Sequence, residues 1–523
     1  MPETDIIAAG PGGAGRLLVT GAWVLAADPA GWDRAGWDRP EPADILIEDG
    51  RIAAIAPGLD AQLPADGVTR LDATDHLAVP GLVNAHYHSH DVLLKGAFEA
   101  IPLDLWSALA LPPAYRPRSL AEIRVRTALG AAECLMRGIT TLQDMPRLHP
   151  FSPEALDAVL DTYDAVGIRA VVSPHFNDLP HSNSAAFWDE ELPAEEQWRL
   201  SGGMPTYPPG TDLAALMAEV VPPCIGRHAR ITLGLGPSAP ERCSPELLRG
   251  VARLADAHGL QVFTHVAESR GKTLHARLHM AAHDRSHIRY LQDCGLLGPH
   301  VTLAHAIWLE DDEIARIADS GAHVVLNVLG NLKTRSGIAP IAGYRRAGAA
   351  LALGCDNCGC NDAQSLLQTM KVFAGLGAVS EPLGDGPTAA ETLHAATLGG
   401  AAAVGLGGVT GCLEVGRRAD LVLFDLADPG FVPLNSAVRQ LVFGDSATAV
   451  RTVLVDGRVV VRDGRLLTVD MARLRADAEN FAEALRAELD EIRQRVDPLM
   501  PHVRRAAERA QAAPWTRDCG CGD

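Results

Sequence analysis

Lysine and positive charge are what this 523-residue sequence has least of. Only four of its 46 basic residues are lysines, and 65 acidic residues give a formal net charge of −19. A chain of this sign is a poor partner for nucleic acid or for an anionic membrane surface, because both are negatively charged themselves. The four lysines, Lys95, Lys272, Lys333 and Lys371, also leave few candidates for chemistry that needs a buried amine.

Long apolar runs and a disulfide pattern are lacking too. No apolar run reaches the roughly 18 residues that cross a bilayer, and the N-terminal residues have neither the basic nor the apolar region of a secretory signal. The ten cysteines show no spacing of a disulfide framework. We therefore expect a soluble, cytoplasmic protein. Because 47% of the residues are hydrophobic, global disorder is excluded and a large core is expected.

The strand and helix patterns divide the chain into four segments. Residues 1–78 and 410–467 contain short alternating strands with Asp-Gly turns, and we expect them to pair into one small β-sandwich domain. Residues 79–409 alternate eight apolar, strand-like runs with helical stretches, which predicts an α/β fold, a (β/α)8 barrel. After the third strand, residues 179–220 are expected to cover the catalytic end. Residues 468–523 are predicted to be a helical tail, because apolar residues recur at spacings of three and four.

Histidines and carboxylates stand at the ends of four of the barrel strands. They are His86 and His88 after strand one, His265 and Glu268 after strand five, His305 after strand six and Asp356 after strand eight. The C-terminal ends of barrel strands meet on one face, where catalytic residues gather. Each such residue alone is more often structural than a ligand. Together, three imidazoles and a carboxylate suit Zn²⁺, Fe²⁺ or Co²⁺, with one position left for water.

Around these residues the sequence resembles the amidohydrolase superfamily. The motifs VPGLVNAHYHSH, GITT, GPSAPERCSPELL, HVAES, LAHAIWL, SGIAP and GCDN occur in the order of that family, followed by LEVGRRADLVLFD and VLVDGRVVV. The resemblance covers residues 15–465 and points to the branch of cytosine, guanine and adenosylhomocysteine deaminases and triazine hydrolases. It implies a distorted TIM barrel that binds one metal and carries a small composite β-domain.

The resemblance also implies roles for the strand-end residues. His86, His88, His265 and Asp356 would bind one divalent transition metal, with zinc first and iron or cobalt as alternatives. Asp356 would act as general base on the metal-activated water, while Glu268 and His305 would act on the substrate and the attacking water. Binuclear relatives carry a carboxylated lysine at the end of strand four. The segment ARITLGLGPSAP contains no lysine, which favours one metal.

Other residues near the strand ends are predicted to contact the substrate. They are His90, His175, Trp308 and Asn331. Strand seven departs from the family pattern, because LNVLGN stands where relatives have His-Asn/Cys-Pro-x-Ser-Asn, and GCDNCGCND after strand eight differs as well. Both segments border the substrate in relatives, so an unusual substrate is expected. Cys355, Cys358 and Cys360 could bind a second metal, but small residues beside a ligand are the simpler explanation.

The predicted function is a mononuclear metal-dependent hydrolase of a C–N bond. Deamination of a small N-heterocycle by metal-bound hydroxide is the leading reaction, and hydrolysis of an amide, urea or carbamate is the alternative. A hypothesis of another functional class is a scaffold protein that has kept the fold and lost catalysis. It is disfavoured because every expected ligand is present. The negative charge favours a neutral or cationic small-molecule substrate. We also expect a homo-oligomer.

Overall fold

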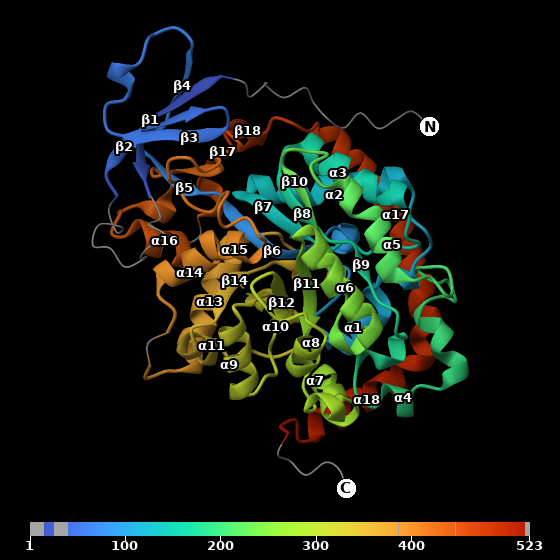
Figure 1. The fold of residues 1–523 in the computed structure, drawn as a ribbon. Coiled ribbons are helices and arrows are strands. Elements are labelled where there is room, and N and C mark those ends of the chain that lie inside the picture. The colour runs from blue at the N-terminus through green and yellow to red at the C-terminus, as the bar shows by residue number, and fades with distance from the viewer. Residues whose placement is uncertain (1–14, 26–39, 385, 445, 518–523) are drawn as a thin grey trace.

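A ring of parallel strands forms the centre of the molecule (Figure 1). The computed structural model describes residues 15–25, 40–384, 386–444 and 446–517. The larger sheet has the order β14-β13-β12-β11-β10-β8-β7-β6-β15, with β9 beside β10. Its strands are β6 (Leu82–His88), β7 (Ile139–Asp144), β8 (Arg169–Val172), β9 (His175–Phe176), β10 (Ile231–Pro237), β11 (Gln261–Val266), β12 (Val301–His305), β13 (His323–Leu326), β14 (Ala350–Leu353) and β15 (Asp356–Asn357).

The eighth strand is broken, and this break closes the ring. β14 pairs with β13, whereas β15, which starts three residues after the end of β14, pairs with β6 at Asp356↔Tyr87. The prediction of a distorted (β/α)8 barrel is therefore confirmed. The break also delivers Asp356 to the edge of β6, next to His86 and His88.

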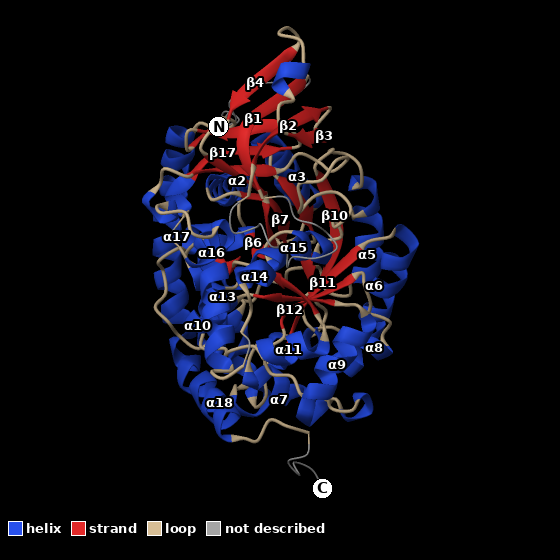
Figure 2. Cartoon of the chain, turned by 90° about the vertical axis from the view of Figure 1, so that its left-hand side faces the viewer, coloured by secondary structure: helices blue, strands red, loops and turns tan. Residues whose placement is uncertain are grey.

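Helices surround the ring on its outside (Figure 2). Those up to the eighth strand are α1 (Leu103–Ala110), α2 (Leu120–Met136), α3 (Pro153–Val166), α4 (Trp188–Glu191), α5 (Leu213–Val220), α6 (Pro245–His258), α7 (Arg270–His279), α8 (His287–Asp293), α9 (Asp311–Ser320), α10 (Val328–Lys333) and α11 (Ile341–Ala347). Those after it are α12 (Cys358–Asn361), α13 (Leu366–Ser380), α14 (Ala389–Ala395), α15 (Leu398–Ala403), α16 (Ala437–Phe443), α17 (Met471–Val496) and α18 (Met500–Ala512). Local sequence sets their ends: Ser244 Oγ caps α6 by accepting the Leu247 N–H, and Gly259 stops it with a φ of 64°.

A second sheet combines strands from both ends of the chain. Its strands are β1 (Arg16–Val24), β2 (Pro42–Glu48), β3 (Arg51–Ala56), β4 (Val68–Asp72), β5 (His76–Pro80), β16 (Leu421–Asp425), β17 (Val450–Val455), β18 (Arg458–Arg462) and β19 (Arg465–Leu466). Antiparallel pairing of β5 with β16 joins the two chain ends into one mixed sheet. The chain passes directly from β5 of this sheet to β6 of the barrel through Gly81.

A buried ion pair connects the barrel to this second sheet. On β8, Arg169 donates to Asp420 through Nε at 2.7 Å and through Nη2 at 3.1 Å, and the Asp456 N–H donates to the same carboxylate at 2.6 Å. Burial alone would raise the pKa of Asp420, but Arg169 outweighs it and holds the pKa below its ordinary value of 3.8. The carboxylate is therefore charged throughout the neutral range.

Replacing Asp420 with alanine is expected to lower the free energy of unfolding by about 3 kcal/mol, because it leaves the buried Arg169 with only the weaker contact to Asp456 at 3.5 Å. Urea denaturation at pH 7 measures this loss. The matched control is Asp157→Ala, which removes an exposed partner of Arg227 and should cost less than about 1 kcal/mol. Since the folded-state pKa of Asp420 is depressed, its contribution persists above the ordinary value of 3.8 and fades as the pH falls further. Equal losses in the two variants would contradict this role.

The two C-terminal helices pack on the barrel of their own chain. α17 packs against α1 and α2, and α18 against α1, α4 and α7. The red helices run along one side of the barrel in Figure 1. Leu485, Leu489 and Ile492 of α17 share a core with Trp106, whereas Val503 of α18 packs with Trp188. This arrangement holds α1, which follows β6, and α4, which lies within residues 179–220, against the C-terminal helices.

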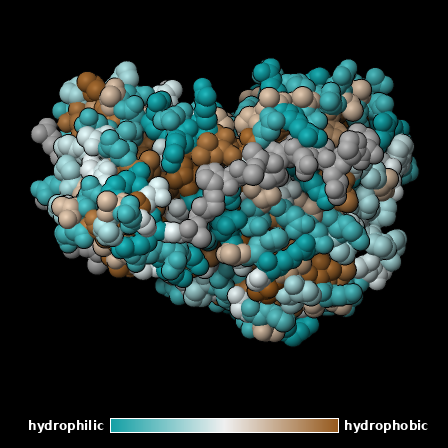
Figure 3. All heavy atoms as spheres, turned by 90° about the horizontal axis from the view of Figure 1, so that it is seen from above, coloured by the Kyte–Doolittle hydropathy of each residue, from teal (hydrophilic) through white to brown (hydrophobic). Residues whose placement is uncertain are grey.

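The surface seen from above is largely hydrophilic, with apolar patches of limited extent (Figure 3). In the described part of the chain, no helix combines the length and the apolar character that a membrane crossing needs.

Candidate metal centre and substrate cavity

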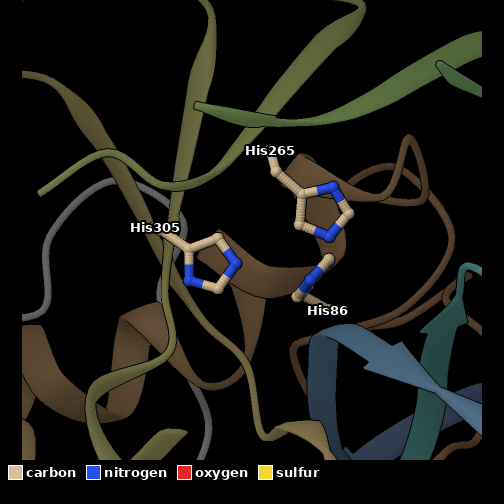
Figure 4. Close-up of side chains that lie close together, drawn as sticks. All are labelled: His86, His265 and His305. Carbon is tan, nitrogen blue, oxygen red and sulfur yellow. The ribbon is translucent and has the colours of Figure 1, made fainter. Parts of the chain in front are cut away.

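The four predicted ligands converge at the C-terminal ends of the barrel strands. The ring centroid of His86 lies 4.7 Å from that of His88 and 4.9 Å from that of His265. Asp356 Oδ1 lies 3.7 Å from His86 Nε2 and 3.6 Å from His88 Nε2. Figure 4 shows His86, His265 and His305 directed towards one point. The donor atoms of His86, His88 and Asp356 lie close enough together to hold a metal ion, and so do those of His86, His265 and His305.

Hydrogen bonds fix which ring nitrogens face this point. His88 Nδ1 donates to Met145 O at 2.8 Å, and His265 Nδ1 donates to Ser238 O at 2.6 Å. Because a carbonyl oxygen only accepts, Nδ1 carries a proton in both rings, and in the neutral ring the lone pair is then on Nε2. Burial lowers the pKa of His86 and of His265 well below 6.5, so both rings are neutral.

The convergent nitrogens suit a cation between them. The Nε2 atoms of His88 and His265 lie 3.3 Å apart, and the Nδ1 atom of each ring already bonds a carbonyl oxygen. His86 Nε2 is buried and has no hydrogen-bond partner among the described residues. Three imidazoles and a carboxylate, with the Nδ1 atoms of two rings held by carbonyl oxygens, fit a divalent transition metal such as zinc.

His305 stands between this cluster and Glu268. Its Nδ1 donates to Asn331 Oδ1 at 2.9 Å, and its Nε2 lies 3.6 Å from Glu268 Oε1 and 4.0 Å from Asp356 Oδ2. His305 also groups with His86 and His265 as a possible ligand. The hydrogen bond from Nδ1 leaves Nε2 free to act on a water or substrate between the two carboxylates.

Backbone strain collects at the same place. His305 has a φ of 71° and Asp356 a φ of 66°, and Ala267 and Ala306 each have a φ of 46°. Such left-handed conformations cost about 1–3 kcal/mol each for residues with a side chain, and they occur preferentially at functional sites. Here the strained residues aim the side chains of His305 and Asp356 into the cluster.

A cavity opens onto the cluster. Its lining includes the metal-side residues His88, His265, Glu268, His305 and Asp356, and the outer residues His90, Asp104, Trp106, Arg147, His175, His181, Ser184, Glu241, Arg242 and Lys272. The segment predicted to cover the catalytic end, 179–220, contributes His181 and Ser184. Two of the predicted substrate contacts, His90 and His175, lie in this lining.

The other two predicted substrate contacts lie elsewhere. Trp308 donates its indole N–H to Ser336 O at 2.6 Å and packs against Trp515, and it is not among the residues that line the cavity. Asn331 is likewise outside that lining and accepts the hydrogen bond from His305. In the structure Asn331 thus orients a cavity residue, whereas Trp308 contacts residues outside the cavity lining.

The sequence patterns did not reveal the acidic wall of the cavity. Lys272 Nζ forms an ion pair with Glu268 and lies 3.9 Å from Glu241 Oε1. Burial raises the pKa of Asp104 to about 6 and that of Glu241 to about 7. Burial alone would raise the pKa of Glu268, but His305 and Lys272 outweigh it and lower the pKa to about 2. One indication was present in the sequence: Lys272 follows Glu268 by four residues, a spacing at which the two side chains can form an ion pair.

The cysteines beside Asp356 are buried thiols. Burial raises the pKa of Cys355 to about 12 and raises those of Cys358 and Cys360 as well. Among the described residues, no cysteine belongs to a group of donor atoms that could hold an ion. The three cysteines are therefore packing residues next to a ligand.

Comparison with known proteins places this site in a family. Residues 77–460 match the sequence model of the amidohydrolase family. The chain belongs to this family. It is 32% identical over 447 residues to the 5′-deoxyadenosine deaminase of Methanopyrus kandleri, covering 85% of this chain and 95% of the relative. It is 30% identical over 465 residues to the 5-methylthioadenosine/S-adenosylhomocysteine deaminase of Syntrophobacter fumaroxidans, covering 87% and 95%.

Solved structures of this amidohydrolase fold resemble the chain throughout. An adenosine deaminase from Xanthomonas campestris with bound zinc has a TM-score of 0.76 and 26% identity, covering 91% of this chain and all of that one. A mutant atrazine chlorohydrolase of Arthrobacter aurescens TC1 with zinc and atraton has a TM-score of 0.74 at 22% identity, covering 89% and 100%, and shares the fold. The predictions of the family and of a hydrolase acting on C–N bonds are confirmed.

Proposed function

We propose that this amidohydrolase is a zinc-dependent deaminase that removes the exocyclic amino group of an adenosine-like nucleoside. The observation that carries the proposal is the set of ring nitrogens of His86, His88 and His265, which converge with Asp356 at the end of a cavity. The relatives named for 5′-deoxyadenosine, 5-methylthioadenosine and S-adenosylhomocysteine support a nucleoside over other N-heterocycles.

His86, His88, His265 and Asp356 would hold one metal ion. A bound zinc ion lowers the pKa of water towards neutrality and so supplies a nucleophile. A single ion is supported by the composition of β10 (Ile231–Pro237), which contains no lysine to bridge a second one. Lys272, which does reach the cavity, is held in an ion pair by Glu268.

The remaining steps fall to side chains of this chain. Asp356 is placed to accept the proton of the attacking water, because its carboxylate lies between the histidine cluster and His305. His305 Nε2 would orient that water or polarise the amino-bearing carbon. Glu268 starts as a carboxylate, consistent with its pKa of about 2, and would take one proton of the attacking water to the ring nitrogen, while the other water proton, accepted by Asp356, would pass to the amino group that leaves as ammonia.

The acidic wall supports a neutral or cationic ring at the metal end of the cavity. The cavity lining carries the carboxyl groups of Asp104, Glu241 and Glu268 around the ammonium of Lys272, and the guanidinium groups of Arg147 and Arg242 line the same cavity. His90 and His175, on other parts of the lining, are proposed to contact the same substrate.

Ammonia release from matched panels tests the proposal. The zinc-loaded enzyme should release ammonia from adenosine, 5′-deoxyadenosine and 5-methylthioadenosine, and convert adenine rings to hypoxanthine rings. The alternative is an amide, urea or carbamate hydrolase of the same fold. Cleavage of such compounds, without ammonia from any amino-heterocycle, would overturn the deaminase in favour of that alternative. The predicted homo-oligomer is tested on the same protein by sedimentation velocity.

A further inference from the structure

A second cavity adjoins the substrate cavity behind His90. His90 and Arg147 line both cavities, so they form the wall between them. The ring of His90 lies 5.1 Å from the ring of the proposed ligand His88. Apolar side chains such as Leu94 and Ile123 line part of the second cavity, and arginines line much of the rest.

Two of these arginines are buried, and the carboxylates that act on Arg126, Glu122 and Asp144, do so from longer range than an ion pair. Arg126 is 4% exposed and Arg147 is 5% exposed. Arg126 Nη1 donates to His90 O at 3.3 Å, and Arg147 Nη2 donates to Asn177 Oδ1 at 3.4 Å. The Nε of each is buried and has no partner among the described residues. Within that part of the chain, no carboxylate oxygen lies within ion-pair distance of either guanidinium.

The carboxylates near this cavity are already used by other arginines. Arg118 forms ion pairs with Glu122 at 3.6 Å and with Glu488 at 2.7 Å, and Arg116 forms an ion pair with Glu491. His149, which also lines the cavity, has its Nδ1 bonded to Thr206 Oγ1 at 2.9 Å, while its Nε2 has no partner in the described residues. The buried Nε donors of Arg126 and Arg147 therefore face this space without a bonded acceptor, whereas Glu122, the carboxylate of the lining, is paired with Arg118.

Burying a guanidinium without a counter-charge is unfavourable, and a bound oxyanion removes that cost through charge-assisted hydrogen bonds. Arginine is suited to this task, because its planar fork matches the two oxygens of a carboxylate or phosphate group. The whole chain has a net charge of −19, but the buried charges without an ion pair in the second cavity, those of Arg126 and Arg147, are positive.

We propose that Arg147, with Arg126 behind it, binds an oxyanionic substituent of the substrate. The substrate would be an amino-heterocycle whose ring lies at the metal end and whose carboxylate or phosphate-type group reaches past His90. This rests on the proposed function for the position of the ring. It goes beyond that function by requiring a charged group that adenosine and 5′-deoxyadenosine lack.

Binding of matched acid and amide pairs tests the proposal. Isothermal titration of the zinc-loaded enzyme would compare adenosine 5′-carboxylic acid with its 5′-carboxamide, and an aminopyrimidine carboxylic acid with its carboxamide. For whichever of the two ring systems binds, the acid should bind at least about tenfold more tightly than its carboxamide. Arg147→Met should reduce this preference to about twofold or less, and Arg147→Lys should retain part of it.

Two further variants make the result decisive. Arg126→Met, whose side chain is further from the ring site, should also lower the acid preference, and it serves if Arg147→Met does not fold. Arg227→Met removes an exposed arginine that pairs with Asp157 and Asp161 and should leave the preference unchanged. If the adenosine pair neither binds nor releases ammonia, the proposed function fails, while the aminopyrimidine pair still tests Arg147. No acid preference on either scaffold, or a preference that survives both methionine variants, would overturn the oxyanion site.

Discussion

Replacing His265 with alanine is expected to release the metal and to lower kcat/KM by about 10⁴-fold or more. The ring is fixed by the hydrogen bond from Nδ1 to Ser238 O, so its Nε2 is presented to the centre already unprotonated and oriented. Removing it leaves His86, His88 and Asp356 facing a gap on the β11 side. Elemental analysis of the purified variant measures the loss of metal, and ammonia release measures the loss of activity.

The control for this variant is His258→Ala. His258 is exposed at the end of α6 and takes no part in the cavity. It should keep full metal content and activity within about twofold of wild type, because exposed positions away from a site tolerate substitution. A His265→Ala protein that retains zinc and a tenth of the activity would show that the assigned centre is wrong.

Replacing Glu268 with glutamine is expected to lower kcat by about 10²–10⁴-fold while the metal content stays unchanged. The amide keeps the shape of the side chain but cannot carry a proton between water, ring and leaving group. Glu268 faces His305 at 3.6 Å and pairs with Lys272, and it is not one of the four proposed ligands. The loss should therefore appear in the chemical step and leave metal binding intact.

Steady-state kinetics and metal analysis of the same preparation distinguish a loss in the chemical step from a loss of metal. Glu246→Gln is the matched control, because Glu246 lies exposed in the first turn of α6. A Glu268→Gln enzyme with kcat within about threefold of wild type would exclude the proton-carrying role. A variant that loses zinc would instead make Glu268 part of the metal site.

Much of the fold was predictable because its signals are local. The barrel strands are short apolar runs, some of them followed by a helix with a capping serine, as in α6, and turns such as that at Asp456 and Gly457 mark the small sheet. The proposed ligands were predictable for the same reason. They stand at the last residues of β6 and β11 and at the first of β15, and strand ends of a barrel share one face.

The cavity walls were less predictable because they depend on packing between distant segments. Asp104, Glu241 and Lys272 come from the connections after strands one, four and five, and meet only once α1 and α7 are held by the C-terminal helices. Trp308 stands three residues beyond His305, but the left-handed residues His305 and Ala306 turn the chain between them. Closeness to a strand end therefore did not give the direction of this side chain.

Titration of metal-free protein with zinc, followed by ammonia release from 5′-deoxyadenosine, tests the central claim most directly. A mononuclear deaminase predicts that activity rises linearly with added zinc and stops at one equivalent per chain, with one ammonia for each hypoxanthine ring formed. Activity that keeps rising to two equivalents would contradict the single metal, and no ammonia at any zinc loading would contradict the deaminase.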